Sequence, residues 1–442
     1  MTNAATLVWG LGIAGRAVAQ VLHDRGERVV LGDDALTDEH RGFAHRLGVE
    51  VVEPKTDGEL SLLISSTSRL APAPGVPEGH RVIAAARLAG IPIVSELELA
   101  YEFEVDSGRH RPMLGITGTD GKTTTTLMTK AILASAGHRP EAVGNTETPL
   151  IAALDSRADS FAVECSSFRL AFTERFRCKA AAWLNVAPDH LDWHPSYDAY
   201  FAAKAKLWAH VSAGDVAVAP VGDEAILGVA RRSNARVVTF GADRGDYHAI
   251  GGVLTSPHGV IMESRSMRRS LPHDVTNALA AAALCIESGL ASPGHVADAL
   301  ASYEHAAHRI EFVRELDGVR WYNDSKATSP HAAAVAIQSF ESIVLIAGGK
   351  NKGLDLAEMA LHRAHVRAVV ATGASAEVIE SAFSGHCEVR KATSMEEAIR
   401  HARELARSGD VVLLSPGCTS YDWYSNYEER GDDFRRRVSA LK

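Results

Sequence analysis

A glycine-rich stretch after residue 113 constrains the fold of this chain more than any other segment. Met113 to Ile116 form an apolar run that predicts a short buried strand, and the residues from Leu127 to Ala136 have helical spacing. Between them, residues 117–123 read Thr-Gly-Thr-Asp-Gly-Lys-Thr. Glycines permit a tight turn, and the backbone N–H groups of such a turn and of the next helix can cradle a phosphate. The segment therefore predicts a nucleotide-binding α/β domain.

The side chains of this loop suit a nucleoside triphosphate. Lys122 supplies a mobile positive charge, and the hydroxyl of Thr123 can ligate Mg²⁺. The pattern GxxxxGK[ST] is not met, because Ile116 occupies the position of its first glycine. A glycine-rich turn with a chance lysine is the alternative, but the strand and helix on either side favour a phosphate loop. The expected nucleotide-binding residues are Gly118, Thr119, Asp120, Gly121, Lys122, Thr123 and Thr124.

Composition excludes several classes of protein. The 442 residues, 46% of them hydrophobic, are enough for two or three domains with real cores. The net charge is −9 and no basic stripe is clustered apart from residues 435–437, which argues against nucleic acid as a partner. Five cysteines without CxxC or histidine spacing fit reduced thiols in a cytoplasmic enzyme. No run approaches the length of a membrane span, and neither a signal peptide nor a membrane partner is expected.

The N-terminal residues 6–34 predict a strand, a glycine-rich turn, a helix and a second strand. The turn reads Gly-Leu-Gly-Ile-Ala-Gly at 10–15, and Asp33 follows the second strand, where a Rossmann-like fold grips a ribose hydroxyl. NAD, a nucleotide sugar and a glycine turn that merely packs are all compatible with this motif. Further strands are predicted at 62–65 and 91–94, with a helix at 82–89 between them.

Acidic and imidazole side chains follow two strands of the second segment. Glu164 ends one strand, and His190 belongs to the Asp-His-Leu-Asp-Trp-His run at 189–194. Ligands bind at the carboxyl ends of neighbouring strands in a doubly wound sheet, and these groups suit Mg²⁺ held partly by water and phosphate. A zinc site is the competing interpretation of 189–194, although no further ligand is placed to complete a tetrahedron. Lys204 lies on a predicted helix and, taken by itself, is expected to be a solvated surface lysine.

A third α/β pattern begins after residue 303. Polar groups at 323–328, 348–353 and 415–420 each end an apolar strand, and loops at one edge of a sheet converge on a ligand. Turn and helix-capping residues are the alternative explanation of their Ser, Thr and Asp content. The strands are predicted at 319–322, 343–347, 368–371 and 411–414.

Taken in order, these motifs resemble the Mur ligases of peptidoglycan synthesis over essentially the whole chain. The resemblance implies an α/β fold of three domains: a Rossmann-like domain for a UDP substrate at 1–109, a central P-loop ATPase with a mostly parallel sheet at 110–303, and a Rossmann-like amino-acid-binding domain at 304–442. The matching segments are 117–123, 144–145, 164–168, 184–192, 200–204, 308–311, 323–328 and 415–431.

The resemblance also implies an activity. Similar enzymes are cytoplasmic, monomeric, ATP-dependent ligases with small-molecule substrates, and the implied reaction adds D-glutamate to UDP-N-acetylmuramoyl-L-alanine through an acyl phosphate. Phosphoryl transfer of this kind is largely positioning and charge neutralisation, which a lysine and two Mg²⁺ ions can supply.

Individual roles follow from the resemblance residue by residue. Lys122 and Thr123 would hold the phosphates and one Mg²⁺, and Glu164 and His190 would hold metal. Lys204 matches a lysine that is carbamylated in similar enzymes and then ligates Mg²⁺, so Lys122, His190 and Lys204 are the catalytic candidates. The other expected ATP contacts are Asn277, Arg309 and Asp324, and the expected substrate contacts are Gly12, Ile13, Ala14, Asp33, Asn145, Ser166, Thr328, Lys352, Ser420 and Tyr427.

Several positions depart from the family pattern. Asp120 stands where Asn or Ser is usual, so a carboxylate lies near the incoming phosphates and weaker ATP binding is expected. On the acceptor side, Thr146-Glu147 replaces Ile-Gly, Ala73 replaces a serine, an insertion is expected within 67–71, and Ala35 stands where some relatives carry an arginine. These departures keep open a ligase that uses L-glutamate, another amino acid or a different carboxylate acceptor. A non-catalytic nucleotide-sensing protein and an NAD dehydrogenase are the alternatives from other classes.

Overall fold

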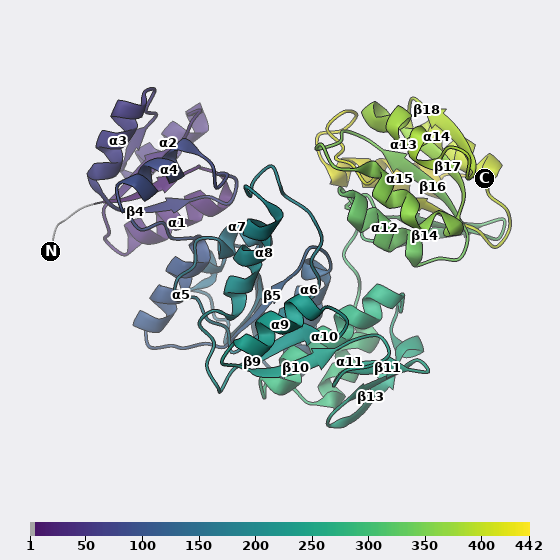
Figure 1. Cartoon of the computed structure of the whole chain (residues 1–442), viewed down its shortest axis with the longest axis horizontal. Coiled ribbons are helices and arrows are strands. Elements are labelled where there is room, and N and C mark those ends of the chain that lie inside the picture. Colours follow the sequence, from purple (N-terminus) through teal and green to yellow (C-terminus); the bar gives the residue numbers. More distant parts are fainter. Residues whose placement is uncertain (1–4) are drawn as a thin grey trace. The chain divides into compact units, whose positions relative to one another are not determined.

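The computed structural model describes residues 5–442, which form two compact units (Figure 1). The first unit contains the chain up to Ser270 together with Asp274–Tyr303, and the second contains Leu271–His273 together with Glu304–Lys442. Both are α/β structures with largely parallel sheets, as predicted. The division of the first unit into two domains at residue 109 stays a prediction.

The N-terminal part of the first unit is a four-stranded parallel sheet in the order β3-β2-β1-β4. Helix α1 follows β1 directly through the predicted glycine-rich turn, and its buried face packs on the sheet. The strands are β1 (Ala5–Trp9), β2 (Val29–Gly32), β3 (Glu50–Val52) and β4 (Thr67–Pro72), and the helices are α1 (Ile13–Asp24), α2 (Asp38–Leu47), α3 (Asp57–Ser65) and α4 (Arg81–Leu88).

Two strand predictions in this region were wrong. Residues 62–65 end helix α3, because Thr56 and Glu59 form a capping box and the buried Leu60 and Ile64 have the spacing of a helix face. Residues 91–94 contribute only an isolated bridge from Ile93 to β4. The segment 67–71, where an insertion relative to the family pattern is predicted, lies within β4 and pairs with β1.

The central sheet of the first unit has six parallel strands in the order β10-β9-β8-β5-β7-β6. Helices α6, α10 and α11 share one apolar core with the sheet, and α5, α9 and η2 share another. The strands are β5 (Met113–Thr117), β6 (Pro140–Gly144), β7 (Ser160–Glu164), β8 (Ala180–Trp183), β9 (Val216–Pro220) and β10 (Arg236–Phe240). The helices are α5 (Glu96–Asp106), α6 (Lys122–Ser135), η1 (Leu150–Ala153), α7 (Ser167–Leu170), α8 (Tyr197–Ala205), η2 (Lys206–Trp208), α9 (Glu224–Arg232), η3 (Ser264–Ser266), α10 (Pro272–Glu287) and α11 (Pro293–Ser302).

A small antiparallel sheet, β11 (His248–Ile250), β12 (Val253–Ser256) and β13 (Gly259–Glu263), completes the first unit.

In the second unit, the sheet order is β14-β15-β19-β16-β17-β18, and only β14 runs antiparallel to its neighbour. Its strands are β14 (Glu311–Leu316), β15 (Val319–Asn323), β16 (Ile343–Gly348), β17 (Val366–Thr372), β18 (Glu388–Ala392) and β19 (Val411–Leu414). Its helices are α12 (Pro330–Gln338), η4 (Leu356–His365), η5 (Gly373–Ser375), α13 (Ala376–Phe383), α14 (Met395–Leu405) and α15 (Tyr427–Ser439).

All five cysteines are free thiols, and four of them are buried, whereas Cys387 is partly exposed. Within residues 5–442, no helix combines the length and the apolar character that crossing a membrane requires.

Candidate active site

The predicted phosphate loop lies between β5 and the first turn of α6. Gly121 caps α6 with a left-handed φ of +80°. A Cβ atom at Gly121 would lie only 2.6 Å from Oδ1 of Asn277, which comes from α10. A glycine is required at this position both for its conformation and for this close approach. The loop therefore brings Gly121 against Asn277, two of the residues predicted to contact ATP.

A residue not included among the predicted contacts holds the loop in shape. Oδ1 of Asn185, just after β8, accepts hydrogen bonds from the backbone N–H groups of Thr119 (3.0 Å) and Asp120 (2.9 Å). The hydroxyl of Thr119 lies 2.9 Å from that of Tyr200 on α8. Asn185 could have been found from its place at the end of an apolar strand, the same signal that marked Glu164. Thr123 lies in the first turn of α6, followed by the buried Thr124.

Two lysine side chains meet at one carbonyl group of the loop. Nζ of Lys122 donates to the carbonyl oxygens of Gly118 (2.9 Å) and Thr119 (2.7 Å), and Nζ of Lys204 donates to that of Gly118 at 2.7 Å. Lys204 is only 1% exposed, so its expected surface position was wrong. Burial first, and the charge of Lys122 second, lower the pKa of Lys204 well below its usual value. The neutral amine is therefore much easier to populate at Lys204 than at an exposed lysine.

Glu164 ends β7 and is almost completely buried. Its Oε1 accepts a hydrogen bond from Nδ2 of Asn145 at 3.0 Å, whereas its Oε2 is buried without a hydrogen-bond partner. Oδ1 of Asn145 in turn accepts from Nη1 of Arg169 at 2.7 Å, and Nε of Arg169 pairs with Glu96 at 3.2 Å. A buried carboxylate oxygen without a donor is suited to a cation. Ser166, also predicted, caps α7 by accepting from the N–H of Arg169.

His190 lies in the loop after β8 with an uncommon positive φ of 55°. Its backbone N–H donates to Oδ1 of Asp189 at 2.8 Å, and its ring packs edge-on against Phe168, 4.6 Å between centroids. No group of three or more His, Cys, Asp or Glu side chains among residues 5–442 could hold a metal ion by itself. The described protein groups therefore form no closed cage of the kind that structural zinc needs.

The end of the same loop contacts the N-terminal sheet region. Nε1 of Trp193 donates to the carbonyl oxygen of Pro74 at 2.9 Å, and the N–H of Glu78 donates to the carbonyl oxygen of Trp193 at 3.2 Å. His194 is buried between Ser167, 3.0 Å from its Nε2, and Glu78. Burial lowers the pKa of His194 despite the neighbouring carboxylate. These contacts tie the loop that carries His190 to the 73–80 segment, where the sequence departs from the family pattern.

Asp33 lies at the glycine-rich turn, as predicted. Its Oδ2 accepts from the N–H of Leu11 at 2.9 Å, and its Oδ1 accepts from the N–H of Ala35 at 3.1 Å. The turn exposes Gly12 and Ile13, and Ala14 is buried. The Asp33 carboxylate thus shapes the turn beside the exposed Gly12 and Ile13.

In the second unit, Asp324 directly follows β15 and is buried. Its Oδ2 accepts from the hydroxyl of Ser415 at 2.7 Å, and its Oδ1 accepts from the N–H of Ile310 at 3.2 Å. Because Ser415 follows β19, its bond to Asp324 brings together the polar residues predicted at the ends of β15 and β19. Arg309 directly precedes Ile310 in the chain. Thr328 and Tyr427 are half-buried, Ser420 is buried, and Lys352 is exposed in the loop after β16.

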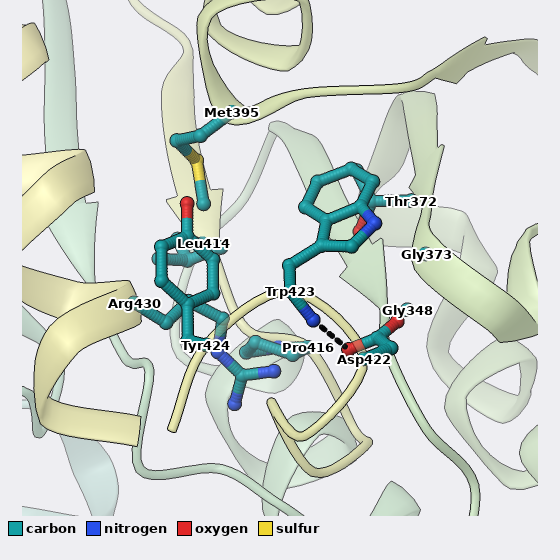
Figure 2. A pocket seen from close by; sticks show the side chains of 11 residues that line it. Gly348, Thr372, Gly373, Met395, Leu414, Pro416, Asp422, Trp423, Tyr424 and Arg430 are labelled. Atoms are coloured by element: carbon teal, nitrogen blue, oxygen red, sulfur yellow. Dashed lines mark hydrogen bonds between the residues drawn. The ribbon is translucent and has the colours of Figure 1, made fainter. Parts of the chain in front are cut away.

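Arg430, which sequence reasoning did not single out, connects three of these segments. Its Nε donates to the hydroxyl of Ser325 (2.9 Å), and its Nη2 donates to the carbonyl oxygens of Ser325 (2.8 Å) and Cys418 (3.1 Å). Arg430 is 4% exposed, and burial lowers its pKa to about 10. Figure 2 shows Arg430 and Tyr424 on one side of a narrow cavity and Trp423 and Asp422 on the other. The guanidinium therefore holds the loops that carry Asp324 and Ser420 against α15, which begins at Tyr427.

Comparison with known proteins decides the family. The Mur ligase middle domain matches residues 116–285, and the glutamate ligase domain of Mur ligases matches residues 308–418. A protein of Frankia casuarinae named UDP-N-acetylmuramoylalanine–D-glutamate ligase is 38% identical over 454 residues, which cover 98% of this chain and 93% of the relative. The chain belongs to the Mur ligase family.

Other Mur ligases agree with this assignment. A protein of Pelotomaculum thermopropionicum with the same name is also 38% identical and covers 100% of this chain and 98% of the relative. The solved UDP-N-acetylmuramate-alanine ligase of Thermotoga maritima shares the fold, with a TM-score of 0.60 at 20% identity, covering 99% of this chain and all of the other. As a Mur ligase, the chain is an ATP-dependent acid–amino-acid ligase. This assignment argues against the two alternatives from other classes, an NAD dehydrogenase and a non-catalytic nucleotide-sensing protein.

Proposed function

We propose that this Mur ligase joins D-glutamate to UDP-N-acetylmuramoyl-L-alanine in peptidoglycan precursor synthesis in the cytoplasm, with ATP as the energy source. The observation that carries the proposal is the match of 38% identity, over nearly the full length of both chains, to relatives that bear this name. The shared length includes the acceptor, nucleotide and amino-acid regions, so the similarity is not confined to a common ATPase core.

The first half of the reaction forms an acyl phosphate. The alanine carboxylate of the acceptor attacks the γ-phosphorus of ATP, its oxygen forms the new P–O bond, and ADP leaves. The phosphate loop and the first turn of α6 hold the phosphates, and Lys122 neutralises charge that develops on them. Asn277 beside Gly121, and Arg309 and Asp324 in the second unit, complete the proposed ATP contacts. Asn145 would contact the acceptor.

Mg²⁺ fits the residues of the first unit. The unpartnered Oε2 of Glu164, the hydroxyl of Thr123 and the imidazole of His190 are the proposed protein ligands, with phosphate oxygens and water completing the shell. Bound there, Mg²⁺ would neutralise phosphate charge and help orient the transferred group.

Lys204 is the proposed second metal-binding position, after carbamylation. Carbamylation needs a neutral amine, and the burial that lowers the pKa of Lys204 favours that form. The Nζ–C bond to CO₂ forms with loss of a proton, and the product is an anion in place of a potential cation. The negative group would relieve the repulsion between Lys204 and Lys122 and would provide oxygen ligands for a second Mg²⁺.

The second half of the reaction uses the C-terminal unit. The amine of glutamate attacks the acyl carbon, and inorganic phosphate leaves from a tetrahedral intermediate. Lys352 would pair with the side-chain carboxylate of glutamate, and Thr328, Ser420 and Tyr427 would hold the amino acid. Gly12, Ile13, Ala14 and Asp33 at the N-terminal turn would face the UDP part of the acceptor, with Ser166 near its reactive end.

The test is phosphate release from ATP by purified protein with UDP-N-acetylmuramoyl-L-alanine, comparing D-glutamate, L-glutamate and no amino acid. We expect turnover with D-glutamate alone. Turnover with L-glutamate would reverse the proposed stereochemistry. ATP binding without turnover for either isomer would reject this acceptor and direct attention to the departures at Thr146 and Glu147.

A further inference from the structure

A buried ion pair lies beside the candidate metal site. Arg169 on α7 and Glu96 on α5 are 6% and 2% exposed, and Nε of Arg169 lies 3.2 Å from Oε2 of Glu96. Oε1 of Glu96 also accepts from the N–H of Ile151 at 2.7 Å, so the carboxylate itself is held in place. Burying two charges is costly unless both are well hydrogen-bonded, and such pairs often contribute more to specificity than to stability. Because the pair lies beside the candidate metal site, we expect it to serve that site more than the stability of the core.

The ion pair determines how the side-chain amide of Asn145 is oriented. Nη1 of Arg169 can only donate, so the atom of Asn145 that it meets at 2.7 Å must be the oxygen. The amide nitrogen then faces Oε1 of Glu164, to which it donates at 3.0 Å. A flipped amide would direct N–H groups at the guanidinium and an oxygen at the carboxylate, and both contacts would be repulsive. Asn145 itself is exposed, so no surrounding core would otherwise fix it.

The orientation of Asn145 in turn leaves one oxygen of Glu164 unpaired. Oε1 is occupied by the amide, whereas Oε2 is buried without a partner. From Glu96 through Arg169 and Asn145 to Glu164, donors and acceptors alternate without a break. The network ends at the one atom of Glu164 that a cation can use, and metal sites commonly depend on such outer residues to orient their ligands.

We infer that Arg169, anchored by Glu96, is a positioning residue that fixes the Asn145 amide and thereby presents Oε2 of Glu164 to a divalent cation. The inference rests on the proposed function, which assigns Glu164 to metal and Asn145 to the acceptor. It adds two residues, Glu96 and Arg169, to the set on which both binding events depend.

The test compares Arg169→Met with a control at a second buried ion pair. Arg111 donates to Glu104 at 2.8 Å in the same unit, and both of these side chains are similarly buried. Binding of Mn²⁺, as a probe of the divalent site, is measured by electron paramagnetic resonance on each protein with a non-hydrolysable ATP analogue. We expect Arg169→Met to weaken Mn²⁺ binding about tenfold, and Arg111→Met to leave it unchanged.

Steady-state kinetics provide the second readout. Arg169→Met should raise the KM for the acceptor and leave the KM for glutamate unchanged, and Arg169→Lys should recover part of the Mn²⁺ affinity. Unchanged Mn²⁺ affinity, or equal losses in Arg169→Met and Arg111→Met, would overturn the inference. If Arg169→Met does not fold, Glu96→Gln weakens the anchor without removing Arg169, and normal Mn²⁺ affinity in that variant also overturns it. An inactive wild-type protein would count against the proposed function alone, because the Mn²⁺ measurement needs no turnover.

Discussion

Nζ of Lys122 and Nζ of Lys204 both donate to the carbonyl oxygen of Gly118, at 2.9 and 2.7 Å. Two ammonium groups this close repel each other, and only Lys122 has access to solvent. Burial and this repulsion lower the pKa of Lys204 and favour loss of its proton. One carbonyl group of the phosphate loop thus holds Lys122 from α6 and Lys204 from α8 side by side.

Replacing Lys204 with methionine should reduce turnover by roughly 100-fold or more, because one charge-stabilising group at the reacting phosphate is lost. Lys206→Met is the matched control, since Nζ of Lys206 donates instead to the carbonyl oxygens of Ala171 and Thr173. Phosphate-release assays with added bicarbonate would measure both variants. Near-normal turnover by Lys204→Met would remove Lys204 from the mechanism.

The same variant should change how stability depends on pH. Because the folded-state pKa of Lys204 is lowered, the unfolded chain binds more protons between that pKa and the ordinary lysine value of about 10.4. The free energy of unfolding of the wild type should rise with pH across this window. The stability gained by Lys204→Met should be largest at low pH and should shrink as the pH rises. Urea unfolding of both proteins at several pH values measures the difference, and a gain that grows with pH would contradict the low pKa.

Gly121→Ala should weaken ATP binding. The new methyl group would meet Oδ1 of Asn277 at 2.6 Å and would also strain a backbone with φ of +80°. Gly137→Ala is the control, because Gly137 has a similar φ of +86° with no neighbour within 4 Å. Both substitutions should cost about 1–2 kcal/mol in backbone strain, whereas only Gly121→Ala should weaken ATP binding, by roughly 10-fold to 100-fold. Calorimetric titration with ATP separates the two effects, and equal ATP affinities would contradict the prediction.

Arg430→Met should raise the KM for glutamate by about tenfold. The reason is that Arg430 donates hydrogen bonds to Ser325 and Cys418, in two of the loops that carry the proposed amino-acid contacts. The KM for the acceptor should stay unchanged. Arg435→Met, on the same helix, is the control, since Arg435 is half-exposed and pairs with Glu311 and Asp432 at the surface. Initial rates against each substrate in turn measure the split. A rise in both KM values would indicate general loosening of the unit.

Asp120→Asn should strengthen ATP binding. Removal of one negative charge beside the triphosphate should lower the Kd by roughly fivefold, or about 1 kcal/mol, and the gain should shrink at high salt. Asp155→Asn removes an exposed carboxylate elsewhere in the first unit and should have no effect. ATP titrations at two ionic strengths measure this. Unchanged or weaker binding would mean that the Asp120 carboxylate is already neutralised by its own neighbours.

The sequence predicted those parts of the molecule that depend on local pattern. The strand and helix around the phosphate loop, the strand that ends at Glu164, the strand just before Asp324 and the glycine-rich turn all formed where periodicity and turn residues placed them. Each is a short apolar run followed by polar residues, so the carboxyl ends of the strands could be read without tertiary information. The roles of the individual side chains remain predictions.

Other features depended on partners far away in the chain. Lys204 has the sequence context of a surface helix, and only its packing under the phosphate loop buries it. The strand prediction at 62–65 was wrong for a local reason instead, because the capping box at Thr56 begins a helix that includes these residues. In the sequence, Arg169 looks like any charged residue on a short helix. Only the folded structure brings Glu96, from another helix, beside it.

The distribution of the thiols has a practical consequence for experiments on this enzyme. Cys165, Cys178, Cys285 and Cys418 are buried, so a maleimide reagent should reach only Cys387, just before the edge strand β18 of the second unit. Partial burial raises the pKa of Cys387, and mildly alkaline buffer will therefore speed the coupling. The unmodified chain thus offers a single attachment point for a fluorophore or spin label, without the need for a cysteine-free background.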